Sequence, residues 1–124
     1  MHKLLNELQE IKGYHYQVWK YQLSLSVLTI RASNDQIKHH NIHITFGSVK
    51  YFQFPLGWTG DLYLASDDEL LQILKQAGIN IKLEIPMSFV KENFSLYKAD
   101  SPNGTIYILG RLNHIERDVE PIFN

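Results

Sequence analysis

Histidines are the side chains in this sequence best suited to metal chemistry, and three of the six lie close together at His39, His40 and His43. On a helix, His39 and His43 would lie one turn apart and could share an ion such as Zn²⁺. Residues 42–46, however, alternate between apolar and polar side chains, which predicts a strand. Positions four apart on a strand are separated by roughly 13 Å, too far for a shared ion. We therefore expect surface or turn histidines and assign no metal ligands.

Paired carboxylates could perform acid–base catalysis, and Asp61, Asp67, Asp68 and Glu69 lie within one short stretch. Ser66 and Glu69, however, match a capping box, in which each side chain bonds the backbone N–H of the other residue at a helix start. Asp67 and Asp68 suit the positive end of the helix dipole. Helix capping thus explains all of these carboxylates except Asp61. Because no pair of unexplained carboxylates is left, we assign no catalytic residue here.

Other catalytic and cofactor motifs are weak. Residues 57–60 contain two glycines but lack the lysine of a phosphate-binding loop, and Ser48 does not lie in a G-x-S-x-G elbow. The chain has no cysteine, which excludes disulfides and thiol catalysis. An enzyme using His43 or His114 with Asp61 remains the weakest of three functional hypotheses. No cofactor is expected.

Aromatic side chains give the strongest hint of a binding role. Trp58 lies in a glycine-rich corner, where it either plugs the end of the sheet or anchors a partner. Our leading hypothesis is a small interaction domain, with an inhibitor, immunity-type or adaptor role, that binds a protein or itself. Its candidate binding residues are Phe54, Trp58, Asp61 and Tyr63. The alternative is a small-molecule pocket between sheet and helices, lined by strand aromatics.

Composition limits the class of protein. At 124 residues and 44% hydrophobic content, the chain fits one globular domain, residues 1–124. A net charge of −1 without a basic cluster argues against nucleic acid as a partner. The N-terminus does not resemble a signal peptide, and no apolar run is long enough to cross a membrane. We therefore expect a cytoplasmic protein with no membrane partner.

Hydrophobic periodicity predicts an α+β fold: a curved, mainly antiparallel sheet of about six or seven strands, with two amphipathic helices packed on it. The helices are expected near residues 3–11 and 67–77, where apolar side chains recur at helical spacing. The second begins at the capping box and ends at Gly78.

The strands are placed by alternation and turn residues. Residues 14–31 predict one long bent strand, or two strands broken near Lys20. Two further strands should meet at a tight turn at Gly47-Ser48 and end at Pro55. Residues 79–85 alternate strictly and predict another strand. A final hairpin, over residues 94–99 and 105–112, should turn around residues 101–104.

Overall fold

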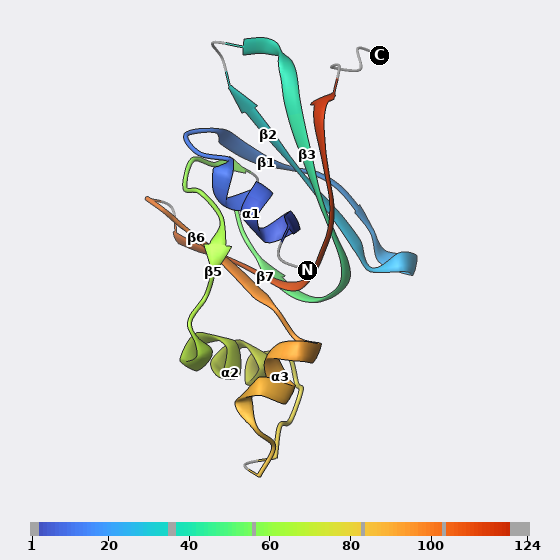
Figure 1. Cartoon of the computed structure of the whole chain (residues 1–124), viewed down its shortest axis with the longest axis vertical. Coiled ribbons are helices and arrows are strands. Elements are labelled where there is room, and N and C mark those ends of the chain that lie inside the picture. The colour runs from blue at the N-terminus through green and yellow to red at the C-terminus, as the bar shows by residue number, and fades with distance from the viewer. Residues whose placement is uncertain (1–2, 35–36, 56, 83, 103, 120–124) are drawn as a thin grey trace.

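The computed structural model describes residues 3–34, 37–55, 57–82, 84–102 and 104–119 (Figure 1). Its elements in chain order are α1 (Lys3–Glu10), β1 (His15–Gln22), the short 3₁₀ helix η1 (Leu23–Leu25), β2 (Val27–Asn34), β3 (Ile37–Gln53), β4 (Gly57–Trp58), β5 (Tyr63–Leu64), α2 (Asp67–Gln76), α3 (Met87–Asn93), β6 (Leu96–Ser101) and β7 (Gly104–Val119).

The strands form one antiparallel sheet in the order β4-β1-β2-β3-β7-β6-β5. Its two edge strands, β4 and β5, are separated in the chain only by residues 59–62. This short segment therefore runs from one edge of the sheet to the other. It passes so close to β6 that a β-carbon on Gly60 would overlap the carbonyl oxygen of Asp100, which explains the glycine. The sheet curls into a half-barrel, and the predicted α+β fold is confirmed.

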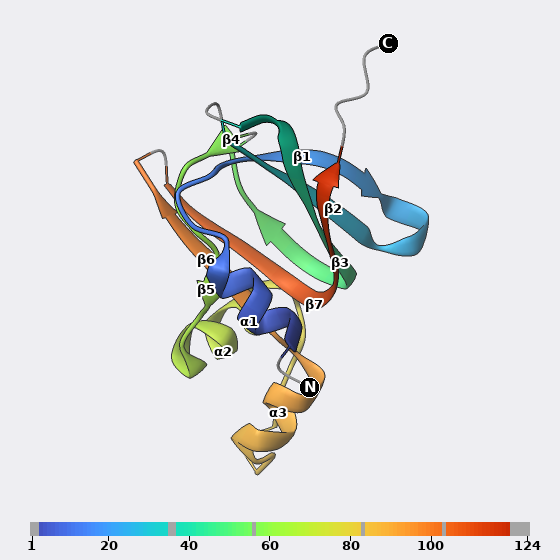
Figure 2. The same cartoon turned by 45° about the horizontal axis from the view of Figure 1, so that its top comes forward.

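The two faces of the sheet pack against different helices. Ile108 and its neighbours on alternate positions point into the half-barrel, where they meet Leu8 and Ile11 from the α1 region. Leu109, one residue later, points outward and packs with Leu70 of α2 and Val90 of α3. Figures 1 and 2 show α1 over the curled sheet, with α2 and α3 together at one end. Period-two alternation along β7 thus builds two hydrophobic cores.

The expected hairpin turn at Gly47-Ser48 is wrong, because β3 continues through it as one bent strand of 17 residues. Ser48 adopts a left-handed conformation with φ 47°, so the positive φ that suggests a turn is present. Between Gly47 and Tyr51, however, β3 places three residues opposite the single residue Gly110 of β7. The local irregularity is a bulge that bends both strands together.

The long strand expected over residues 14–31 is also wrong. β1 and β2 form a hairpin whose connection is η1 followed by Ser26, which has φ 52°. The break therefore falls after Gln22 and not near Lys20. The register shifts between Val18 and Lys20, so Trp19 is a bulge in β1.

The second helix agrees with the sequence prediction. Ser66 and Glu69 form both bonds of the capping box, and Gly78 follows the last turn with φ 79°. The strand expected over residues 79–85 is wrong, because no residue described there pairs with a strand. Ile79, Ile81 and Ile85 instead pack against the outer core, the hydrophobic cluster that includes Leu70, Leu109 and Val90. The segment leads into α3, a third helix that the sequence analysis did not predict.

The last hairpin is confirmed, with Ser101 paired to Gly104 at the turn between β6 and β7. Within the described ranges, no helix is both long and apolar enough to cross a membrane.

Candidate functional site

A chain of aromatic rings runs from the interior of the half-barrel to its surface. Tyr16 stacks on Trp58 at a centroid distance of 5.7 Å, and Trp58 stacks on Phe54 at 6.1 Å. Phe54 stacks on Phe52 at 4.9 Å, and Phe52 meets the edge of Tyr21 at 4.9 Å. Trp58 is only 2% exposed, whereas Phe52 is 37% exposed. The rings therefore join the core to a solvent-facing surface.

The four residues proposed from the sequence do not form one surface. Phe54 and Trp58 are neighbours in the ring chain, but Trp58 is buried. Asp61 accepts hydrogen bonds from the Gly13 N–H (3.0 Å) and the Tyr16 hydroxyl (2.8 Å), which ties the 59–62 segment to the start of β1. Tyr63 lies on the opposite edge strand from Trp58. These two bonds give Asp61 a structural role that the sequence did not reveal.

Tyr63 belongs to a polar cluster on the outer face of β5, β6 and β7. Its hydroxyl donates to Asp100 at 2.8 Å. Nearby, Glu69 of α2 forms a 2.6 Å ion pair with Lys98 and accepts a 3.0 Å bond from Tyr107. The Lys98 ammonium, with Tyr107 and Ser66, lowers the pKa of Glu69 to about 2. Since each charge and hydroxyl has a partner, we interpret this cluster as the attachment of α2 to the sheet.

Of the described residues, the two most exposed large apolar side chains lie on the β1–β2 hairpin. Leu23 and Leu25 of η1 are 78% and 66% exposed, and Trp19 is 40% exposed. Figures 1 and 2 show the turn of this hairpin projecting beyond the rest of the sheet. Phe52 is also exposed, but it lies on the opposite, concave face of the sheet, where its ring contacts Tyr21. We call Trp19, Leu23 and Leu25 the hairpin surface.

Sequence reasoning missed the hairpin surface for a definite reason. Leu23 and Leu25 alternate with Ser24 and Ser26, so they resemble the inward-facing residues of a strand. No glycine, proline or asparagine marks the turn. The available signal was at Leu28, where the alternation of apolar and polar side chains shifts by one position. We interpreted this shift as a bend within one strand.

Trp19 also covers a cation on the convex face of the sheet. The Arg31 guanidinium lies 4.2 Å from the centre of a Trp19 ring and is itself 7% exposed. His43, which pairs with Arg31 across β2 and β3, contacts Trp19 at a centroid distance of 5.8 Å. Burial of the imidazole and the nearby charge of Arg31 lower the pKa of His43.

Among the described residues no metal site is assembled, and His43 and Asp61, which the enzyme hypothesis pairs, are not brought together. The structure describes no cluster of three or more potential metal ligands, and the side chains of His39 and His40 lie outside the described part of the chain. His43 contacts Trp19 on the convex face, whereas Asp61 bonds Gly13 and Tyr16. His43 and Asp61 therefore serve different parts of the fold.

A groove of about 820 Å³ lies between the helices and the sheet. Leu4 and Leu5 of α1 line one part, Leu70 of α2 and Met87 of α3 line another, and Tyr97 of β6 contributes from the sheet. Polar side chains, among them the Asp67–Lys91 ion pair at 3.4 Å, also line it. Its size falls in the range of small-molecule sites, roughly 300–1,000 Å³.

The fold and these surfaces define a single-domain α+β protein: a half-barrel of seven antiparallel strands with helices on both faces and an apolar hairpin that projects from it. Comparison with protein-family models, with curated proteins and with solved structures finds no match for this chain.

Proposed function

We propose that this chain is a small protein-interaction domain, with an inhibitor, immunity-type or adaptor role, that binds a protein partner or a second copy of itself through an aromatic-rich apolar surface. The hairpin surface carries this proposal. Two leucines at a projecting turn remain largely in water, on the same hairpin as the exposed Trp19. Burying such side chains contributes about 25 cal/mol per Å² of apolar area, so a partner would gain from covering them.

The conformation of the turn supports the same role. Ser26 is held in the left-handed region, which costs a residue other than glycine about 1–3 kcal/mol and often marks functional segments. The Ser26 carbonyl accepts a 3.0 Å bond from the Val49 N–H, so the turn is fixed against β3. A pre-organised apolar turn loses little conformational entropy on binding.

The double variant Leu23→Ser/Leu25→Ser tests the proposal. Because both side chains are exposed, we expect the melting temperature to change little and binding to fall at least about tenfold, corresponding to 1.4 kcal/mol. Leu71→Ser, which makes the same substitution at an exposed leucine of α2, is the control. Affinity purification from the source cells with quantitative mass spectrometry, and sedimentation analysis for self-association, give the readout. Identical co-purifying proteins and identical mass for all three proteins would contradict the proposal.

The groove between helices and sheet favours a second candidate, a small-molecule-binding domain. Leu64 lines this groove and is itself exposed, so Leu64→Trp should occupy part of it without disturbing the core. Native mass spectrometry of gently purified protein should then show a small bound mass on the wild type that Leu64→Trp loses. A bare wild-type chain that also binds no apolar fluorescent probe would remove this candidate.

A further inference from the structure

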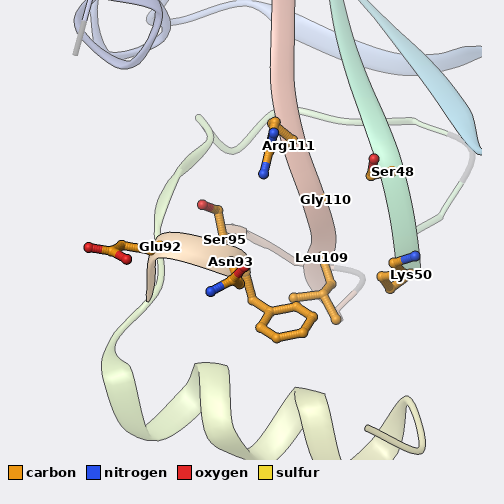
Figure 3. A pocket seen from close by; sticks show the side chains of 9 residues that line it. Ser48, Lys50, Glu92, Asn93, Ser95, Leu109, Gly110 and Arg111 are labelled. Carbon is orange, nitrogen blue, oxygen red and sulfur yellow. The ribbon is translucent and has the colours of Figure 1, made fainter. Parts of the chain in front are cut away.

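A small polar notch opens where β3 bends, between that bend, the end of α3 and the middle of β7 (Figure 3). Its volume is about 50 Å³, which is enough for a group the size of a few water molecules. Two of its lining residues, Phe94 and Leu109, are apolar. The remaining lining residues are polar or glycine: Ser48, Lys50, Glu92, Asn93, Ser95, Gly110 and Arg111.

Cations dominate the charge of the notch. Lys50 comes from β3 and Arg111 from β7, and neither forms an ion pair with a carboxylate of the residues that the structure describes. Glu92 is the single acidic residue of the lining, and Figure 3 shows its carboxylate directed away from the other side chains. The amide nitrogen of Asn93 already donates to the Phe89 carbonyl at 2.9 Å. The lining thus carries two cations without an ion-pair partner in the described part of the chain.

Backbone hydrogen bonds hold the walls of the notch in place. The Val49 N–H donates to the Ser26 carbonyl at 3.0 Å, and the Gly110 N–H donates to the Ser95 carbonyl at 3.1 Å. Ser48, the residue before Val49, adopts φ 47°. A site with fixed walls and two cations is suited to a small oxyanion, since charge-assisted hydrogen bonds are roughly twice as strong as neutral ones.

We propose that the notch binds a single oxyanion group, and that its occupant is a carboxylate side chain of the protein partner. The choice of occupant, although not the site itself, rests on the proposed function. Val49 connects the two features: it bonds Ser26 at the end of the hairpin turn and lies between Ser48 and Lys50 of the notch. A partner seated on Leu23 and Leu25 therefore meets the notch next, and we expect an acidic residue beside its apolar contact.

The site is tested without any partner. Sodium acetate and inorganic phosphate are titrated separately into ¹⁵N-labelled protein at constant ionic strength. We expect amide shifts at Ser48–Lys50, Ser95 and Gly110–Arg111. Lys50→Gln/Arg111→Gln should weaken anion binding at least about tenfold, and Glu92→Gln should strengthen it. Lys20→Gln, an exposed cation on β1, is the matched control and should change nothing. Shifts that persist in the double variant, or that spread over every cationic surface, would overturn the site.

The occupant is tested on the partner complex. Lys50→Glu/Arg111→Glu should weaken the complex at least about tenfold and reduce its salt dependence, while thermal stability is retained. If acetate binds the notch but charge reversal leaves the complex unchanged, the site stands and the carboxylate occupant is wrong. If phosphate binds about 100-fold more tightly than acetate, free phosphate replaces the carboxylate as occupant. If neither the leucine variant nor the charge variants lose partner binding, the result counts against the proposed function. It leaves the anion site, which is tested separately, unaffected.

Discussion

The α-carbon of Gly110 in β7 lies so close to the carbonyl oxygen of Gly47 in β3 that a β-carbon on Gly110 would come within 3.2 Å of it. The same β-carbon would lie 3.2 Å from a methyl group of Val49. The two glycines therefore let the paired strands bend at one point. This shared bend separates the part of β3 that pairs with β2 from the part that ends in the aromatic rings.

Gly110→Ala should destabilise the protein by about 1–3 kcal/mol, the usual cost of overpacking a tightly packed site. The atoms that the new methyl group meets belong largely to the backbone of β3, which can move only if the bend opens. Urea unfolding followed by tryptophan fluorescence measures the change. A variant as stable as the wild type would mean that the bend does not depend on this contact.

Gly47→Ala is the matched control for the same bend. Its β-carbon would overlap the amide of Asn113, whose exposed side chain can rotate away. We expect a smaller loss than for Gly110→Ala, and almost none when Asn113→Ala is also present. If both glycine variants lose the same stability and Asn113→Ala does not restore it, the cause is the backbone conformation of glycine and not steric overlap with the new methyl group.

Trp58 is expected to act through packing and not through its N–H. The side chain is buried between Tyr16 and Phe54, and its indole nitrogen has no hydrogen-bond partner among the residues that the structure describes. Trp58→Ala should therefore cost about 3–5 kcal/mol, as large-to-small core substitutions do. Trp58→Phe should cost much less, because it removes no hydrogen bond and leaves one fewer unpaired buried donor. Chemical unfolding of the two variants compares them, and equal losses would contradict this account.

The sequence was sufficient where local chemistry decides the structure. Ser66, Glu69 and Gly78 specify both ends of α2, since capping involves only residues near each end. The β6–β7 turn is likewise local. In both cases the partners of a residue lie within a few positions along the chain, so pattern and structure coincide.

The sequence was insufficient where the partner of a strand decides the structure. Residues 79–85 alternate because one face packs on the outer core, but alternation records a buried face and not a hydrogen-bonded neighbour. Similarly, Ser48 has the φ of a turn residue, yet β7 bends with β3 and keeps the pairing. Long-range pairing is not encoded in either segment alone.

The binding residues were harder to predict than the fold. Trp58 was a reasonable candidate by residue type, but the rings of Tyr16 and Phe54 bury it. The notch combines Lys50 and Arg111, which are 61 positions apart and line it together only because β3 and β7 bend together. Neither cation belongs to a motif, so only the tertiary structure brings them together.

His43 should make the protein less stable in mild acid. Burial of its ring and the charge of Arg31 lower its pKa below the ordinary 6.5, although Glu116 acts in the opposite direction. Below about pH 6.5 the unfolded state therefore binds the proton more readily, and the free energy of unfolding falls. His43→Gln should flatten this part of the stability profile, whereas His114→Gln, at an exposed position, should leave it intact. Urea midpoints between pH 5 and 8 provide the measurement, and a slope unchanged by His43→Gln would assign the effect to another group.

Glu69 should control stability at lower pH through the opposite charge. Its pKa is about 2 in the folded protein against an ordinary 4.5, because Lys98, Tyr107 and Ser66 favour the carboxylate. The stabilisation is therefore complete above about pH 4.5 and is lost as the pH falls towards 2. Glu69→Gln can keep the capping box while removing the charge, so it should lower stability at neutral pH and reduce the acid slope. Asp68→Asn removes a charge from the same helical turn without touching Lys98 and should retain the slope. Thermal unfolding from pH 2 to 7 distinguishes the two variants; equal slopes would show that helix-dipole charge, and not the Glu69–Lys98 pair, sets the acid stability.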